Sequence, residues 1–474
     1  MGWWAWWDQG LYQKAAAAWA DGVTDPLFHW YLPGYPLLGA AFVRVTPADP
    51  FLLPNLASLL GTLWLFCGVA SRLLDDVPLR VPAACGLFVA TSLSPRVLWS
   101  WVVPWTTTPE TVCIFGALLG TMRLVEGGRR RDAVLTGLAT AAIAGFRPAD
   151  AAVVGLAICA VAGPALLSSR RRLPAILMAA GGGAMIPLLA FGGAHLASWG
   201  ARLSSYLVLS SRIGFEPRLF ALRWVTLMLD PHPLYPGGRG FAGVFFWVLP
   251  GFAGMAAALL AARRGGALAH RLVVGALVGD VALFLTYRDL HPTGLWDHGN
   301  YHYFKWTLPL FALYAFRLLP TVMMRDKRRP AAITAACLAI PALSCWQAGV
   351  SLSEPLQADK EGLSITVASG LCPVSAMVLV PGHGPGAPPV VNGSAETASG
   401  TVLRYGFDFV IYGTDETLRI VPLRPLPPEP TIVRFSKDTY VDQELAPLLV
   451  RQTIAWGLPF WLAGAPQAHG AVSR

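Results

Sequence analysis

Apolar residues occur along the chain in long runs that are separated by short polar segments. A membrane-spanning helix needs about 20 mostly apolar residues. Several runs contain Gly or Pro, which packed membrane helices tolerate. The pattern predicts an all-α polytopic membrane protein with about ten spanning helices, at residues 51–74, 79–98, 105–123, 132–147, 149–167, 173–192, 241–262, 271–287, 304–320 and 331–350.

Basic residues cluster in every second connection between these runs. Cytoplasmic loops of membrane proteins carry the excess of Lys and Arg, so these connections are predicted to be cytoplasmic. Residues 1–50, the loops near 99–105, 193–240 and 288–303, and the tail after 350 are then outside, as in a multi-pass protein of a bacterial inner membrane. The basic residues are Arg72, Arg80, Arg123, Arg129, Arg130, Arg131, Arg170, Arg171, Arg172, Arg263, Arg264, Arg271, Arg317, Arg325, Lys327, Arg328 and Arg329.

The first 50 residues contain no basic region followed by an apolar signal segment. An N-terminus outside the membrane therefore suggests a further spanning helix upstream, which would make eleven in the full gene product. Within this segment, residues 9–21 and 33–46 are too short to span, and we expect two helices that lie along the outer membrane interface.

After residue 350 the pattern changes to short β-rich runs, such as 364–368, 376–380 and 407–412, separated by Gly/Pro-rich stretches. This predicts a small extracytoplasmic α+β appendage. The last apolar run, 445–463, is interpreted as an interfacial helix or, alternatively, an additional span. The predicted domains are therefore an outer loop with two interfacial helices (1–50), a transmembrane core (51–350) and an extracytoplasmic C-terminal domain (351–474).

Composition supports a membrane protein. Hydrophobic residues make up 54% of the chain and charged residues only 13%, about half the charged fraction of soluble domains. The net charge of +9 comes from short clusters between apolar runs, which argues against a nucleic-acid partner and for contact with membrane lipids. The seven cysteines form no CxxC pair, and a disulfide between Cys345 and Cys372 is one alternative to free thiols.

Polar residues at one depth on the outer side are candidates for a site. Asp8 is either a helix-capping carboxylate or a functional acid, and Glu110, after Pro109, has the same two interpretations. Arg147 either extends to lipid headgroups or contacts a phosphate. The outer-side candidates are Asp8, Lys14, His29, Arg96, Glu110, Arg147, Asp150, Arg288, His291, Asp297, His298, His302 and Lys305.

Two further features of the sequence can each be interpreted in two ways. Asp297, His298 and His302 have a spacing that zinc could use, but Gly299 and Asn300 interrupt the helix that would align them, so no metal is expected. Asp280 lies deep in the eighth run, where a charge must be paired or protonated. We favour a hydrogen bond to a neighbouring helix over a proton path.

Five segments in this order resemble motifs of GT-C class membrane glycosyltransferases. Asp8-Gln-Gly-Leu-Tyr12-Gln-Lys-Ala15 is similar to the Asp-Glu-x-x-Tyr-x-x-x-Ala segment of their first outer loop, and residues 31–42 to their second interfacial helix. The similarity continues in Thr108-Pro-Glu110, Gly145-Phe-Arg-Pro148 and Asn300-Tyr-His-Tyr-Phe-Lys-Trp-Thr-Leu-Pro309. The chain most resembles the dolichyl-phosphate-mannose–protein mannosyltransferase and aminoarabinose transferase group over residues 1–320.

The resemblance implies transfer of a sugar from a polyprenyl-phosphate donor to a lipid, polysaccharide or protein acceptor on the periplasmic face, without cofactor or metal. It assigns Asp8 as the general base and Glu110 as a second acid. Cations at Arg147, with Lys305 or His302, would receive the leaving phosphate, and the other substrate-binding candidates are Tyr12, Lys14 and His298. The chain departs from the family pattern at Gln9, where the family has Glu, and near Leu32-Pro33, where a lysine is missing.

Two other functions stay open. A non-catalytic GT-C relative that serves as an assembly subunit would agree with Gln9 beside Asp8. A transporter or flippase of a lipid-linked saccharide would depend on Asp280, although we find no internal repeat of the kind many transporters carry.

Overall fold

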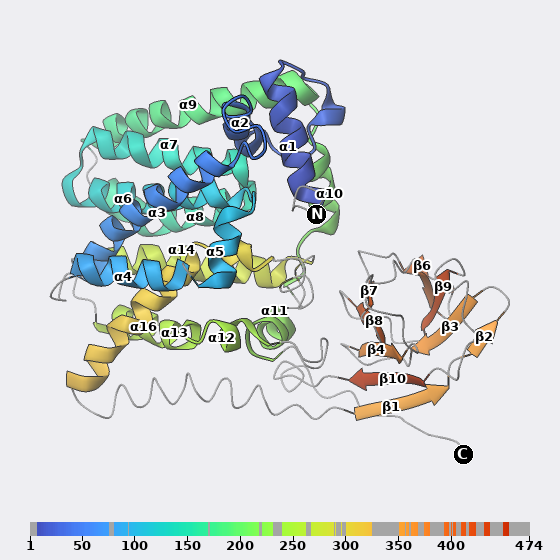
Figure 1. Ribbon diagram of the computed structural model, residues 1–474. Coiled ribbons are helices and arrows are strands. Elements are labelled where there is room, and N and C mark those ends of the chain that lie inside the picture. Colours follow the sequence, from blue (N-terminus) through green and yellow to red (C-terminus); the bar gives the residue numbers. More distant parts are fainter. Residues whose placement is uncertain are drawn as a thin grey trace. The chain divides into compact units, whose positions relative to one another are not determined.

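The structure is a computed structural model of the chain (Figure 1). The chain divides into two compact units, one formed by residues 1–212, 245–284 and 299–337, and the other by residues 213–244, 285–298 and 338–474. The residues that the structure describes are 7–74, 80–92, 94–168, 171–217, 220–230, 239–261, 267–288, 290, 295 and 300–324, and, from Val350 onward, the strands given below with residue 400.

The first unit begins with α1 (Trp7–Ala20), η2 (Pro26–Phe28) and α2 (Gly34–Ala40). Helices are therefore found in both segments predicted to lie at the interface, and that position stays a prediction. Gly22, with φ of 73°, ends α1 in the left-handed conformation that favours glycine. α2 is shorter than predicted because the chain turns after Ala40.

The remaining helices of this unit are mostly long and apolar. By length and composition, α3, α8, α9 and α14 are each able to cross a membrane, so the chain is a multi-pass membrane protein; the count of ten spans stays a prediction. The predicted tenth span, 331–350, lies almost wholly outside the described residues. The bounds are α3 (Leu52–Leu73), α4 (Arg80–Ser92), α5 (Pro95–Val102), α6 (Thr107–Gly127), α7 (Arg130–Phe146), α8 (Pro148–Leu167), α9 (Leu173–Trp199), α10 (Ser205–Ile213), α13 (Val248–Ala261), α14 (Ala267–Thr286), η5 (Asn300–Phe304) and α16 (Thr307–Met324).

The segment predicted as a span at 79–98 is a bent pair of helices. α4 and α5 meet at an angle of 86°. Ser94 has an extended backbone (φ −58°, ψ 139°) and Pro95 follows it as the first residue of α5. A residue before proline is pushed out of the helical region, which accounts for the break.

Helix α6 is the most enclosed of these helices. Its buried residues run from Thr107 to Leu124 and include four threonines and Glu110. It packs against α3, α7 and α8 (Figure 1). A helix surrounded by other helices needs no lipid-facing apolar surface, which explains why α6 is less apolar than the span candidates.

The relative directions of packed helices agree with the alternation of basic clusters. α6 and α7 are antiparallel, because Gly116 faces Ala139 and Gly120 faces Thr136. α3 and α6 are parallel, with Gly61 near Val112 and Gly68 near Leu119, and α13 and α16 are also parallel, through the pairs Gly251–Phe311 and Gly254–Tyr314. The alternation predicts the same directions: the first and third spans parallel, the third and fourth antiparallel, and the seventh and ninth parallel. Which end of each span faces outside stays a prediction.

Small residues allow these helices to approach closely. A Cβ on Gly137 of α7 would lie 1.9 Å from the carbonyl oxygen of Ala180, and one on Gly183 of α9 would lie 2.2 Å from that of Val134. Helices in lipid associate through such close packing rather than through the hydrophobic effect. The α7–α9 contact is therefore fixed by glycine.

The second unit contains α11 (Phe220–Arg223), the π-helix η4 (Trp224–Leu229) and α12 (Phe241–Val244). Arg223 donates from its guanidinium to the carbonyl oxygens of Tyr287 and Arg288. Arg288 in turn pairs with Glu216 at 3.0 Å. These bonds join residues 216–223 to the two residues that follow α14.

After Val350 the described residues of this unit form antiparallel strands in two sheets, with orders β1-β10-β4-β8-β7 and β2-β3-β9-β5-β6. Because β10 lies within 445–463, the predicted helix or span there is wrong; β10 pairs with β1 and β4 instead. The outer-side location of these strands, and the predicted domain bounds, stay predictions. The strands are β1 (Val350–Pro355), β2 (Gln357–Asp359), β3 (Gly362–Val367), β4 (Val374–Leu379), β5 (Gly393–Thr397), β6 (Val402–Leu403), β7 (Phe409–Gly413), β8 (Thr417–Pro422), β9 (Thr431–Ser436) and β10 (Leu449–Ile454).

Candidate functional site

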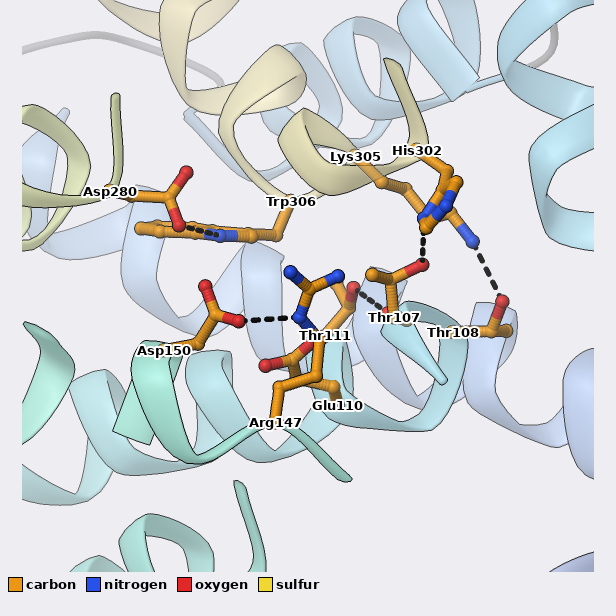
Figure 2. A network of polar contacts seen from close by, with 10 residues as sticks. All are labelled: Thr107, Thr108, Glu110, Thr111, Arg147, Asp150, Asp280, His302, Lys305 and Trp306. Atoms are coloured by element: carbon orange, nitrogen blue, oxygen red, sulfur yellow. Dashed lines mark hydrogen bonds and ion pairs between the residues drawn. The ribbon is translucent and has the colours of Figure 1, made fainter. Parts of the chain in front are cut away.

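Charged and polar side chains of the first unit gather where several helices end (Figure 2). They come from the start of α6, the junction of α7 and α8, the last third of α14, and η5 with the residue after it. That these ends lie on the outer side of the membrane stays a prediction from the distribution of basic residues. The titratable residues are each only 1–8% exposed: Glu110, Arg147, Asp150, Asp280, His302 and Lys305.

Arg147 is the central cation of this cluster. It joins α7 to α8, and Pro148 begins α8 at the next residue. Its Nε donates to Asp150 Oδ2 at 2.6 Å and lies 3.7 Å from Glu110 Oε2. The guanidinium also lies over the rings of Tyr303, at 4.3 Å, and Phe284, at 5.0 Å. A guanidinium fixed through Nε and stacked on rings can offer its outer nitrogens to a planar anion.

Three carboxyl groups share this one guanidinium. Asp150 interacts with the carboxyls of both Glu110 and Asp280. Asp280 Oδ1 accepts a hydrogen bond from Trp306 Nε1 at 3.3 Å (Figure 2). The hydrogen bond of Asp280 was expected with a neighbouring helix, whereas Trp306 lies in the turn between η5 and α16. Asp280 also belongs to an acid cluster that its sequence position alone did not predict.

Lys305 lies beside this cluster and is almost completely enclosed. Its Nζ donates to the carbonyl oxygen of Ser100 at 2.6 Å and to Thr108 Oγ1 at 2.7 Å. The ammonium lies 4.8 Å from the centre of the Trp101 ring.

His302 stands between Lys305 and Arg147. Its ring stacks on Trp105 with centroids 3.9 Å apart, and its Nδ1 forms a 3.1 Å hydrogen bond with Thr107 Oγ1. Burial lowers the pKa of His302 well below its ordinary value, and the positive charges of Arg147 and Lys305 lower it further. The imidazole is therefore held in its neutral form.

Several buried polar atoms of this cluster have no hydrogen-bond partner among the described residues. Buried polar groups are nearly always paired with protein or water, so unpaired groups call for an explanation. Their concentration here is the pattern of a site that receives a polar ligand. They are Trp101 Nε1, Trp105 Nε1 and His302 Nε2.

Asp8 lies in the first turn of α1 and is partly buried. One carboxylate oxygen accepts a hydrogen bond from the Tyr31 hydroxyl at 2.5 Å. Tyr12 packs on Tyr31 with ring centroids 4.4 Å apart, and both belong to an aromatic cluster with Tyr35 and Phe51. Burial raises the pKa of Tyr31, and the neighbouring Tyr12 and Asp8 raise it further, so the tyrosine remains a hydrogen-bond donor.

Tyr206, in α10, connects Asp8 to the buried cluster. Its ring lies 5.1 Å from that of Tyr31. Burial raises the pKa of Tyr206, Arg147 lowers it, and the carboxylates of Asp150 and Asp8 raise it, so both groups of charges act on this hydroxyl. Tyr206 and Tyr31 were not among the candidate site residues; Tyr31 begins the motif at 31–42, whereas no local motif marks Tyr206.

Two other candidates lie away from the cluster. Lys14 is exposed, donates to the carbonyl oxygen of Leu27 at 3.2 Å and lies over the Phe28 ring. Lys14 follows Asp8 by six residues in α1, so its side chain points about 240° around the helix axis from that of Asp8. Gln9 is buried and donates to the carbonyl oxygen of Pro104 at 3.2 Å. It therefore connects α1 to the segment before α6 and does not form an acid pair with Asp8.

His298 and Asp297 lie outside the described residues, so the zinc alternative stays untested. Within the described part of the chain, no group of three or more His, Cys, Asp or Glu side chains is arranged to hold a metal ion.

No protein-family model matches the sequence, and no curated protein matches it. Among solved structures, the chain is similar to the cryo-EM structure of the arabinosyltransferase EmbB from Mycobacterium smegmatis, with 13% identity and a TM-score of 0.28. The alignment covers 94% of this chain and 64% of that chain. At this level the likeness carries no argument about fold or activity.

Proposed function

We propose that the protein is a membrane glycosyltransferase that moves a sugar from a polyprenyl-phosphate donor to an acceptor on the periplasmic face of the inner membrane. The observation that carries the proposal is the buried Arg147, stacked on Tyr303 and surrounded by unpaired polar atoms, at the helix ends where a lipid-linked phosphate would arrive. The resemblance to GT-C glycosyltransferases agrees with it.

Asp8 is the proposed general base. It would take the proton of an acceptor hydroxyl as that oxygen attacks the anomeric carbon of the donor sugar. Its hydrogen bond from Tyr31 supports the role, because it fixes the orientation of the carboxylate. The rings of Tyr12 and Tyr206 both pack on that of Tyr31, which holds its hydroxyl against Asp8.

The leaving group of this reaction is the polyprenyl phosphate. As the bond between the anomeric carbon and the phosphate oxygen breaks, the electron pair moves to that oxygen, and the developing charge needs nearby cations. Arg147 would bind the phosphate through its outer nitrogens, and Lys305 is the second buried cation of the cluster. Glu110 and Asp150 fix the guanidinium, and His302 offers Nε2 as a hydrogen-bonding group.

The test is sugar transfer in membranes that contain the full chain. Radiolabelled polyprenyl-phosphate hexose and pentose would be the donors, and extracted lipid, polysaccharide and protein the acceptors. We expect Asp8→Asn to lower transfer roughly 10²–10⁴-fold, which is the usual contribution of a general base. Asp21→Asn is the matched control, because Asp21 follows the same helix and is exposed.

Transfer by the wild type that is lost in Asp8→Asn but retained in Asp21→Asn, at equal expression, supports the proposal. Equal transfer in both variants removes Asp8 from the mechanism. The absence of transfer by the wild type across the donor panel would favour an assembly subunit.

The assembly-subunit alternative has one observation in its favour. Gln9, where the family pattern has a second acid, is committed to the carbonyl oxygen of Pro104. The transporter alternative rests on Asp280, and it predicts that uptake or flipping of a lipid-linked saccharide depends on this residue while Asp8 is dispensable.

A further inference from the structure

A second charged site lies at the opposite end of α6. A cavity of about 440 Å³ opens where α3 and α6 end and α7 begins. Glu126, on its wall, is 16 residues along α6 from Glu110, a distance of about 24 Å at the rise of an α-helix. The distribution of basic residues assigns this end to the cytoplasmic side.

Positive charge exceeds negative charge in this cavity. Its charged lining residues are four arginines and two carboxylates: Arg72, Arg123, Arg129, Arg131, Glu126 and Asp132. A fifth guanidinium adjoins the turn, because a Cβ on Gly128 would lie 3.3 Å from Arg172 Nη1.

The two carboxylates leave half of the positive charge of the four lining arginines uncompensated. Arg72 donates from Nε and Nη2 to Glu126, so this pair neutralises itself. Asp132 lies in the first turn of α7, where a carboxylate complements the helix dipole. Arg123, Arg129 and Arg131 form no ion pair with another described residue.

The backbone contributes charges of both signs here, because α3 and α6 end at the cavity with the negative ends of their dipoles and α7 begins there with its positive end. Gly128, with φ of 62°, ends α6 in the left-handed conformation, and α7 begins two residues later. This tight turn places the positive end of the 17-residue α7 dipole beside the arginines.

We infer that this cavity binds a phosphate group, with Arg129 and Arg131 as its principal ligands and Arg123 behind them. The excess of two positive charges matches a phosphomonoester, which carries about −1.5 to −2 at neutral pH. The rule that places arginines in cytoplasmic loops accounts for their number but not for a cavity between three helix ends. The phosphate could belong to an acidic lipid headgroup, which the position at the end of a spanning helix favours, or to a soluble phosphate.

Binding would be measured on the purified full chain by the increase in unfolding temperature with each ligand. The ligands are detergent micelles doped with phosphatidic acid, micelles doped with phosphatidylcholine, and inorganic phosphate, the last compared with chloride at equal ionic strength. Arg129→Gln/Arg131→Gln is the test variant. Arg130→Gln is the matched control, because Arg130 lies between the two ligands in sequence but does not line the cavity.

We expect phosphatidic acid to stabilise the wild type and Arg130→Gln, and the double variant to bind at least about tenfold more weakly, as expected from the loss of charge-assisted hydrogen bonds. Stabilisation by phosphatidic acid alone identifies a lipid headgroup, and stabilisation by inorganic phosphate identifies a soluble source; both support the site. Equal weakening in Arg130→Gln, or no stabilisation by either phosphate compound, overturns it. This experiment measures ligand binding, so its outcome does not depend on whether the protein transfers a sugar.

Discussion

Arg147 and Asp150 form a 2.6 Å ion pair across the first turn of α8, with Pro148 as the first residue of that helix. The bond runs from Nε, which leaves the two outer nitrogens of the guanidinium on the side away from Asp150 (Figure 2). Asp150 therefore acts on the proposed reaction through Arg147, as a positioning residue. The ion pair with Asp150 fixes the direction in which the guanidinium of Arg147 points.

The first prediction concerns Asp150→Asn. Loss of the charged partner should let the guanidinium rotate, so the KM for the polyprenyl-phosphate donor should rise roughly tenfold, whereas the KM for the acceptor should change little. Glu110, 3.7 Å from Arg147, continues to compensate the cation, so the protein should lose only about 1–3 kcal/mol of stability.

Asp150→Glu is the control for this prediction, because it keeps the charge and should restore most of the donor KM. Steady-state kinetics with each substrate varied in turn would check both variants. A purely structural role for Asp150 would instead change expression and both KM values together.

The second prediction concerns Asp280→Asn. Three buried carboxyls compete for one guanidinium, so replacing one of them with an uncharged isostere removes like-charge repulsion. Asn retains an oxygen that can accept the hydrogen bond from Trp306 Nε1. We expect an unfolding temperature equal to or above that of the wild type, and glycosyl transfer within about threefold of it. Loss of all activity with intact folding would instead favour the transporter alternative.

Some of the site could be predicted because its signals are local in sequence. Glu110 follows Pro109 at a helix start, and Arg147 precedes Pro148, so both were placed at the outer helix ends. The three-residue spacing of Arg147 and Asp150 was visible in the same way, since such residues are neighbours on one helix face.

The rest of the site depends on which helices pack together, and hydrophobic periodicity does not contain that information. Asp280 meets Asp150 because α14 packs on α8, with Gly279 near Val153 and Gly275 near Ala157. Nothing local to Asp280 indicates that partner.

The break between α4 and α5 was missed for a different reason. The hydropathy of residues 79–98 predicts a span, whereas Ser94-Pro95 predicts an extended residue before the proline and therefore a break in the helix. A local stereochemical rule outweighed the apolar pattern at this point.

The third prediction compares two glycines on the packed pair α7 and α9. A Cβ on Gly137 would lie 1.9 Å from a backbone oxygen of α9, while one on Gly181 would meet nothing within 4 Å. Gly137→Ala should therefore force the helices apart and cost about 1–3 kcal/mol. Gly181→Ala should be neutral or stabilising by up to about 1 kcal/mol, because alanine favours the helix.

Thermal unfolding of both glycine variants in the same detergent would measure this difference. Equal stability of the two variants would contradict close packing of α7 on α9.

The last prediction concerns the dependence of stability on pH. Burial, and then the charges of Arg147 and Lys305, lower the pKa of His302 in the folded protein, whereas an unfolded histidine takes up a proton near pH 6.5. Below about pH 6.5 the unfolded chain therefore binds a proton that the folded chain does not, and stability falls as the pH is lowered further. Above that pH the contribution is constant, because both states are neutral at this residue.

His302→Asn keeps a side chain able to hydrogen-bond Thr107 but removes the titrating group. Between pH 6.5 and pH 5 the wild type should lose up to about 1.4 kcal/mol more per pH unit than this variant, and the two curves should be parallel from pH 7 to pH 8. Unfolding temperatures of both proteins across pH 5–8 would measure the difference. Curves that remain parallel down to pH 5 would mean that His302 takes up its proton in the folded protein as readily as in the unfolded chain, and that burial beside Arg147 and Lys305 does not keep it neutral.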